Sequence, residues 1–111
     1  MVRLLMDKIL KAKQKYNVTL FQTPKFGQTK GYQQVYHLSV DASDHQEALA
    51  IVYKMFNVHD LMPKDYHARF LSTGDILLID KGGRGQACYK LCPGGWKKVS
   101  RIHISSNVNK F

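Results

Sequence analysis

The sequence from Phe70 to Leu91 reads FLSTGDILLIDKGGRGQACYKL, and this stretch decides the predicted fold. Residues 76–79 form a short continuous apolar run, which is typical of a strand buried on both faces of a sheet. Gly74, in the turn before the run, is free to adopt a positive φ. The glycines at 82, 83 and 85 predict a hairpin into a second strand at 86–91. We therefore expect this hairpin at the centre of the sheet.

Three more strands are predicted around this hairpin. Alternating apolar residues and a following proline indicate a strand at 17–23, and a second alternating run predicts one at 33–40. The last strand is expected from Trp96 to Ile104, after a tight turn at 92–95. Its apolar phase changes along the strand, which predicts a bulge near Lys97 and Lys98.

Two helices are predicted, one of them central to the core. Ser43 and Gln46 match a capping box, so the main helix is expected to begin after Ser43. Its broad apolar stripe extends to Phe56, and Asn57 is a candidate for a left-handed residue at its end. A basic amphipathic helix is predicted over 2–14, which either packs on the domain or docks on a partner; contact with a membrane surface is not favoured, because the helix is short and has no Trp or Phe.

The predicted element order is α-β-β-α-β-β-β, which indicates an α+β fold with an antiparallel sheet of about five strands. One main helix packs on this sheet, or the sheet curls toward a small barrel. The domain limits that follow are an N-terminal helix at 1–15, a single domain at 16–104 and a polar tail at 105–111. The expected core includes the following residues of the strands and the main helix: Tyr36, Leu38, Val52, Met55, Phe56, Ile76 and Leu78.

The chain of 111 residues has a formal charge of +9 that is unevenly distributed. Residues 1–30 carry seven Lys or Arg and one Asp, and residues 81–111 carry seven Lys or Arg and no acidic residue. Residues 31–80 carry three Lys or Arg against seven Asp or Glu, a net charge of −4. This asymmetry either indicates an acidic partner or serves solubility alone. No apolar run is long enough to span a bilayer and no signal peptide is recognisable, so we expect a cytoplasmic protein.

No catalytic or cofactor-binding constellation is apparent in the sequence. Cys88 and Cys92 are expected to be unpaired structural thiols, and no spacing of His and Cys suggests a metal site. Asp75 follows a glycine at the entry to a strand, where an aspartate usually bonds the backbone of the turn rather than acting as a base. We therefore expect no enzyme activity, no cofactor and no metal.

Partner-binding residues are expected on loops and hairpin tips, because loops held by a rigid sheet are favoured sites of recognition. Phe26 stands in a loop that is rich in glycine and lysine, where it either anchors a partner or folds back onto the core. The candidate contact residues are Lys25, Phe26, Lys30, Arg84, Lys97 and Lys98.

A nucleic-acid-binding module is the alternative. Tyr89 and Trp96 lie among basic residues of the last strands, and such interleaving suits the stacking of single-stranded bases. We expect both aromatics to be buried in the core rather than free to stack, and no RNP motif, KH loop or helix-turn-helix signature is present.

Five motifs together resemble the YodL family of Bacillus over roughly residues 16–104. They are LFQTP at 20–24, GYQQVY at 31–36, MFNV at 55–58, DYHARFLSTGD at 65–75 and GGWK at 94–97. The resemblance implies a small cytoplasmic protein without recognised enzyme activity, linked to rod-shape control in spore-forming bacteria through the actin-like cytoskeletal protein MreB. It carries over no catalytic residue, and the helix predicted at 2–14 lies outside it. We therefore expect a protein that binds another protein, with MreB as the implied partner.

Overall fold

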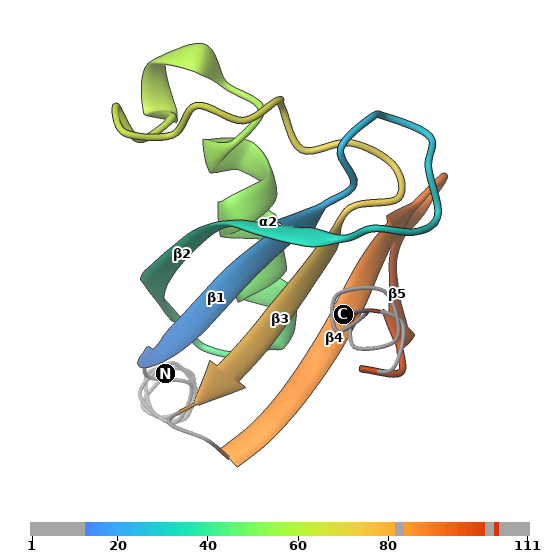
Figure 1. The fold of residues 1–111 in the computed structure, drawn as a ribbon. Helices are drawn as coiled ribbons and strands as arrows, with labels where there is room; N and C mark the ends of the chain where they lie inside the picture. Colours follow the sequence, from blue (N-terminus) through green and yellow to red (C-terminus); the bar gives the residue numbers. More distant parts are fainter. Residues whose placement is uncertain (1–12, 82–83, 102–103, 105–111) are drawn as a thin grey trace, which may run out of the picture.

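The computed structural model describes residues 13–81, 84–101 and 104, and its strands form one five-stranded sheet (Figure 1). The strands are β1 (Gln14–Gln22), β2 (Gln33–Ala42), β3 (Ile76–Lys81), β4 (Arg84–Cys92) and β5 (Gly95–Val99). Their order across the sheet is β2-β1-β3-β4-β5, and every neighbouring pair is antiparallel. The apolar run at 76–79 therefore lies in the central strand, as predicted. The described strands leave β2 and β5 as open edges, so they do not close into a barrel.

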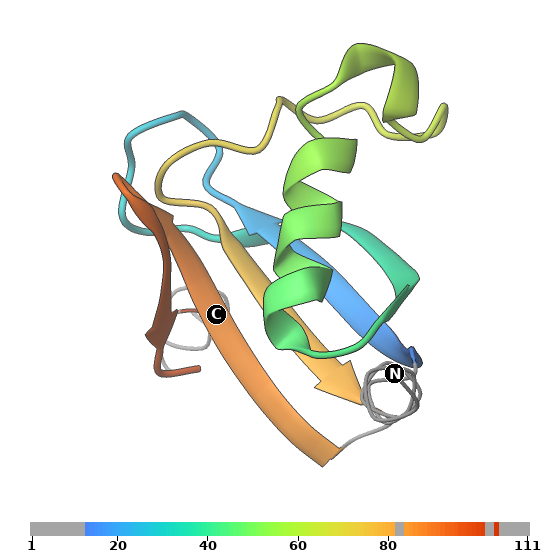
Figure 2. The same cartoon turned by 180° about the vertical axis from the view of Figure 1, so that it is seen from behind.

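Helix α2 (His45–Met55) packs on one face of the sheet, which confirms the α+β arrangement (Figure 2). Its N-cap is Asp44 rather than the predicted Ser43: the Asp44 carboxylate accepts a hydrogen bond from the backbone N–H of Glu47 at 2.9 Å. The Glu47 carboxylate in turn accepts from the backbone N–H of Ser43 at 2.6 Å. Two charged acceptors form this capping pair, and they are stronger than the hydroxyl and amide of the predicted pair.

The connection from α2 to β3 contains a short 3-10 helix, η1 (His59–Leu61). The C-cap of helix α2 is Phe56, with φ −93°. No described residue other than glycine has a positive φ, so the left-handed conformation predicted for Asn57 is wrong. Most of the helix predicted at 2–14 and the whole predicted tail lie outside the described part of the chain, which leaves out residues 1–12 and 105–111. Strand β1 begins at Gln14, within the range given to that helix.

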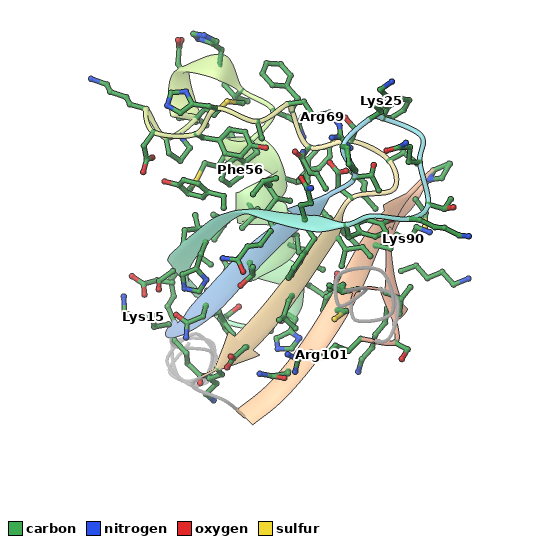
Figure 3. The ribbon with its side chains drawn as sticks, viewed as in Figure 1. Lys15, Lys25, Phe56, Arg69, Lys90 and Arg101 are labelled. Carbon is green, nitrogen blue, oxygen red and sulfur yellow. The ribbon has the colours of Figure 1, made fainter. Side chains whose placement is uncertain are left out.

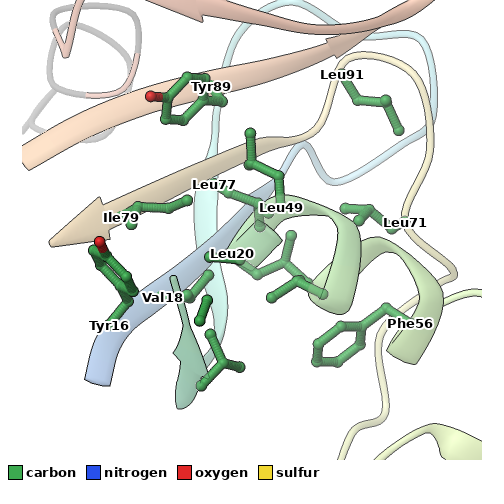
Figure 4. Close-up of a cluster of buried hydrophobic side chains, with 14 of the residues drawn as sticks. Tyr16, Val18, Leu20, Leu49, Phe56, Leu71, Leu77, Ile79, Tyr89 and Leu91 are labelled. Atoms are coloured by element: carbon green, nitrogen blue, oxygen red, sulfur yellow. The ribbon is translucent and has the colours of Figure 1, made fainter. Parts of the chain in front are cut away.

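The main hydrophobic core lies between the sheet and α2 (Figure 4). Val18, Leu20, Leu77 and Ile79 point from the sheet toward the helix and are fully buried. Helix α2 contributes Ala48, Leu49 and Val52, and Phe56 follows at its end. Val18 is paired with Ile79 and Leu20 with Leu77, so neighbouring strands stack their apolar side chains in register.

A second, smaller cluster lies on the opposite face of the sheet. It consists of the buried residues Phe21, Tyr32, Ile76, Cys88 and Ile104, with Leu78 and Val99 packed against it. Strand β3 is therefore covered on both faces, as its continuous apolar run predicts.

The prediction for β5 was wrong both in the end of the strand and in the bulge. The strand ends at Val99 instead of Ile104, and its register with β4 is continuous from Gly95 to Val99 without a bulge. Trp96 packs against the main core and Val99 against the second cluster. The apolar phase changes because the strand contributes to two cores, and a bulge is not needed to account for it.

The predicted core residues are buried to different degrees. Ile76, Val52 and Phe56 are fully buried, as predicted. Tyr36, Leu38, Met55 and Leu78 are half-buried and pack against the edges of the two clusters. On the central strand, Leu77 and Ile79 hold the main core instead of Leu78.

Candidate protein-binding groove

Three loops meet at one end of the sheet (Figure 1). They are residues 23–32 between β1 and β2, residues 70–75 before β3, and the turn at 93–94 between β4 and β5. Hydrogen bonds join the first two loops to each other and to the end of β4. The Tyr32 hydroxyl donates to the Gly74 carbonyl at 2.6 Å, the Gly74 N–H donates to the Leu91 carbonyl at 2.7 Å, and the Leu91 N–H donates to the Asp75 carbonyl at 2.9 Å. Gly74 has φ +100°, which favours glycine at this point.

The Asp75 carboxylate is hydrogen-bonded to three segments near these loops, and the residue is only 1% exposed. One carboxylate oxygen accepts from the Arg69 guanidinium at 3.0 Å. The other accepts from the Gln22 amide at 3.0 Å and from the Ser72 backbone N–H at 2.8 Å. Arg69 also donates to the Thr23 carbonyl at 2.7 Å. The bond to Ser72 confirms that Asp75 secures the turn backbone, and the remaining bonds join β1 to the loop before β3.

Burial is the main cause of the shifted pKa values in this network. It raises the pKa of Asp75 above its ordinary value, against the opposing effect of the bonds from Ser72, Gln22 and Arg69. Burial, with the nearby Asp75 charge as the second cause, also raises the pKa of Tyr66 to about 12. The Tyr66 hydroxyl donates to the Arg69 carbonyl at 2.5 Å, so it is a structural donor. These hydrogen bonds fix the start of the loop at 23–32 relative to the loop at 70–75.

An open groove of about 620 Å³ lies between this loop end and helix α2. Its apolar lining is rich in aromatic and bulky side chains: Phe26, Tyr53, Leu71, Leu91, Pro93 and Trp96. Tyr53 comes from α2, Trp96 from β5 and Phe26 from the loop between β1 and β2. We call this site the aromatic groove.

Phe26 is the most exposed large apolar side chain in the described part of the protein, at 66%. It does not fold back onto the core, which was one of the two alternatives that the sequence left open. It also lines a second hollow, together with Thr73 and Lys90. Tyr53 is 45% exposed, and Trp96 is half-buried against the main core. A partner can therefore contact several aromatic surfaces at this end of the molecule.

The predicted contact residues fall into separate places. Lys25, Phe26 and Lys30 share the loop between β1 and β2, and all three are exposed. Figure 3 shows Lys25 close to Arg69 at the loop end of the sheet. Arg84 begins β4 at the opposite end of the sheet, because β3 and β4 are joined there. The six residues therefore do not form one contact surface.

Lys97 and Lys98 are both exposed on β5, and they point to opposite faces of the sheet. Trp96 and Lys98 lie on the face that carries α2, as the main-core packing of Trp96 indicates. The Lys98 charge lowers the pKa of His45 at the start of α2, a smaller effect than that of burial. Lys98 is thus on the side of the aromatic groove, and Lys97 is on the far side.

Sequence reasoning missed Tyr53 and Phe70 as exposed aromatics. Tyr53 lies outside the apolar stripe of α2, and this position is the signal that could have identified it. Phe70 is 49% exposed and stands next to the buried Leu71, with no pattern that distinguishes the two. Phe70 does not line the aromatic groove.

The cysteines and the potential metal-binding side chains of the described residues are not gathered at one place. Cys88 and Cys92 are both free and lie on β4, and burial raises the pKa of the Cys88 thiol. The described residues contain no group of three or more His, Cys, Asp or Glu side chains that could hold a metal ion. In the same part of the chain, no helix is long and apolar enough to cross a membrane.

The chain matches one protein-domain model and one protein of similar sequence. Residues 6–101 match the model of the YodL-like domain. The chain is 48% identical over 91 residues to "Uncharacterized protein YodL" of Bacillus subtilis (strain 168), a match that covers 82% of this chain and 88% of that protein. No solved structure matches the chain. The domain match begins at residue 6 and so includes part of the segment 2–14, which the resemblance noted in the sequence did not reach.

Proposed function

The chain belongs to the YodL family, and from that premise we propose that it is a non-enzymatic cytoplasmic protein that binds another protein through the aromatic groove. The proposed partner is the actin-like filament protein MreB, whose assembly it perturbs, so that cell shape changes in a spore-forming bacterium. The choice of MreB rests on the family resemblance alone. The observation that carries the protein-binding part is the 66% exposure of Phe26 beside the groove.

The composition of the groove supports protein binding. Tyr and Trp are enriched among the residues that dominate binding energies, and aromatic residues in general are enriched in protein interfaces. Phe26, Tyr53 and Trp96 come from three different elements: the loop between β1 and β2, helix α2 and strand β5. Tyr53 and Trp96 are on regular elements, and the bonds of Arg69 to Thr23 lie near the start of the Phe26 loop. A preorganised aromatic surface loses little conformational entropy when a partner binds it.

The surrounding charge supports an acidic partner surface. Lys25 and Lys30 are on the same loop as Phe26, Lys54 follows Tyr53 on α2, and Lys98 shares the groove side of β5. Exposed lysines at the rim of an interface increase the association rate with a negatively charged partner, and salt weakens this effect.

Nucleic-acid binding is less well supported. Tyr89, one of the two aromatics expected to stack on bases, is only 9% exposed. Its hydroxyl lies 2.9 Å from Nδ1 of His45, and its ring packs against the His45 ring. Trp96 alone remains of the proposed stacking pair.

The proposal is tested by pelleting purified protein with polymerised MreB. Replacing Phe26 by Ala should weaken binding at least about tenfold, the equivalent of about 1.4 kcal/mol, because an exposed anchor is removed. Phe70→Ala is the matched control: Phe70 is also a largely exposed phenylalanine, but it does not line the groove. For charge, Lys98→Glu should slow association more than Arg84→Glu, which changes the opposite end of the sheet.

Three outcomes would contradict the proposal. Equal binding by wild type and Phe26→Ala would exclude the groove. Failure of the wild type to pellet with filaments at low salt would exclude MreB as the partner. Strong binding to DNA or RNA that falls steeply with salt, with no filament binding, would favour the nucleic-acid alternative.

A further inference from the structure

We propose that two copies of this chain form a two-fold symmetric dimer in which their β2 strands pair antiparallel and join the two sheets into one. This surface is distinct from the aromatic groove. The proposal starts from the backbone of β2, which forms one open edge of the sheet.

Strand β2 is long and paired on one side only. It extends over ten residues, Gln33–Ala42, and pairs with β1. Within the described part of the chain, no backbone hydrogen bond from another segment reaches its other side. In an antiparallel edge strand about half of the N–H and C=O groups point outward, and these can pair with another strand.

The two edges of the sheet differ in how they are protected. Strand β5 is five residues long and carries Lys97 and Lys98, and short edges with lysines discourage pairing. Strand β2 is twice as long and contains no Lys, Arg or Pro. Its one charged residue, Asp41, lies 3.6 Å from the Lys15 ammonium on β1. The pairing of β2 with β1 skips Val35, which is a bulge, and bulges discourage pairing at an edge. From Tyr36 to Ala42 the pairing is regular, and this part of β2 has few of the features that prevent edge pairing.

From Tyr36 to Ala42 the side chains of β2 alternate between apolar and polar. Tyr36 and Leu38 are half-buried at the edge of the main core, on the face that carries α2. On the other face, His37 lies 3.1 Å from the Thr19 hydroxyl, and Ser39 donates to the Asn17 side chain at 2.9 Å. An added strand must present apolar residues on the first face and uncharged polar residues on the second.

A second copy of β2 meets this requirement. When Leu38 is placed opposite its own symmetry mate, Tyr36 lies opposite Val40 of the other copy, and His37 lies opposite Ser39. At the centre of the strand this register pairs apolar with apolar and polar with polar. Toward its ends Val35 lies opposite Asp41, and no like charges are directly opposite.

The dimer has a consequence that rests on the proposed function. Antiparallel pairing of two identical edges requires a two-fold axis perpendicular to the sheet, so the two loop ends point in opposite directions. The dimer would then present one aromatic groove at each end and could contact two partner subunits at once. Dimer formation itself is measured without any partner, so its failure is separate from failure of the proposed function.

Sedimentation equilibrium on the full chain tests the dimer directly. We expect the apparent mass to rise with concentration to twice the monomer mass. His37→Lys combined with Ser39→Lys places lysines opposite one another across the axis and should abolish the dimer. The control adds the same charge on the exposed surface of α2, as Gln46→Lys with Ala50→Lys, and should dimerise like wild type. Circular dichroism verifies that both variants are folded.

A cysteine at the two-fold axis tests the register. Directly opposite residues of an antiparallel pair are about 4.5–5.5 Å apart between Cα atoms, within the range of a disulfide. Leu38→Cys, in a background with Cys92→Ser, should therefore oxidise to a covalent dimer, whereas Ala50→Cys in the same background should not. A wild type that stays monomeric at every concentration would overturn the proposal. A folded double-lysine variant that still dimerises, or a Leu38→Cys chain that crosslinks no better than Ala50→Cys, would overturn the assigned edge.

Discussion

At the residue scale, the ion pair of Asp75 and Arg69 joins strand β1 to the loop before β3, through the bonds to Gln22 and Thr23. Asp75 is 1% exposed, while the Arg69 side chain is 28% exposed. Arg69 Nε is buried without a partner in the described part of the chain. The pair is therefore asymmetric: the carboxylate is fully bonded by protein groups, and the guanidinium is only partly removed from water.

Replacing Arg69 by Met keeps much of the aliphatic stem but leaves the Asp75 carboxylate without its cation. We expect a loss of about 1–3 kcal/mol in the free energy of unfolding at neutral pH, less than for a fully buried pair because Arg69 is partly exposed. A carboxyl whose pKa is higher in the folded than in the unfolded state contributes stability at low pH that is lost as the pH rises through the folded pKa. The deficit of Arg69→Met should therefore shrink as the pH falls and Asp75 becomes protonated.

Urea denaturation over a pH series measures this effect. Lys15→Met, which removes the cation from the exposed pair with Asp41, is the control and should change stability by less than about 0.5 kcal/mol. A deficit for Arg69→Met that is the same at acidic and neutral pH would show that Asp75 is not the group involved.

The sequence predicts the role of Asp75 but not its partners. Its place after Gly74 at the entry to a strand indicates the turn bond to Ser72, which is a local interaction. Gln22 and Arg69 belong to segments whose position depends on the pairing of β1 with β3, and no local pattern predicts that pairing. The same limit explains why Tyr53 and Trp96 could not be combined into one groove from the sequence.

At the element scale, β3 is the strand that both hydrophobic clusters share. Leu77 faces the main core and is fully buried, whereas Leu78 faces the second cluster and is only half-buried. The continuous apolar run predicts a strand with two covered faces, but it does not tell which face has the larger core. That information lies in helix α2, which packs on the side of Leu77 and Ile79.

Truncation of these two leucines should therefore have unequal effects. Leu77→Ala should destabilise the protein by about 2–5 kcal/mol, because it leaves a cavity beneath α2. Leu78→Ala should have a smaller effect, because part of the Leu78 side chain is already exposed to water. Chemical denaturation of both variants provides the comparison, and an equal or larger loss for Leu78→Ala would contradict the assignment of the two faces.

At the scale of the whole molecule, charge and aromatic surface coincide at the loop end of the sheet. The sequence shows the uneven charge and places Phe26 in a loop, and the motifs indicate the family. It leaves open whether Phe26 is exposed, which the structure shows. It does not show that Arg84 lies at the opposite end or that Lys97 and Lys98 face apart, because these facts depend on strand order and register. In the structure, Phe26, Lys25 and Lys30 share one loop, and Lys98 lies on the face of the sheet that carries α2.

Hydrogen exchange of the protein, alone and bound to MreB filaments, tests the central claim most directly. If the aromatic groove is the binding site, backbone amides in residues 23–32 and 92–98 should become protected in the complex. Amides at the hairpin end, in residues 84–88, should exchange at the same rate in the free and the bound protein. Protection confined to the hairpin end, with the loops around Phe26 unchanged, would contradict the assignment of the groove as the binding site.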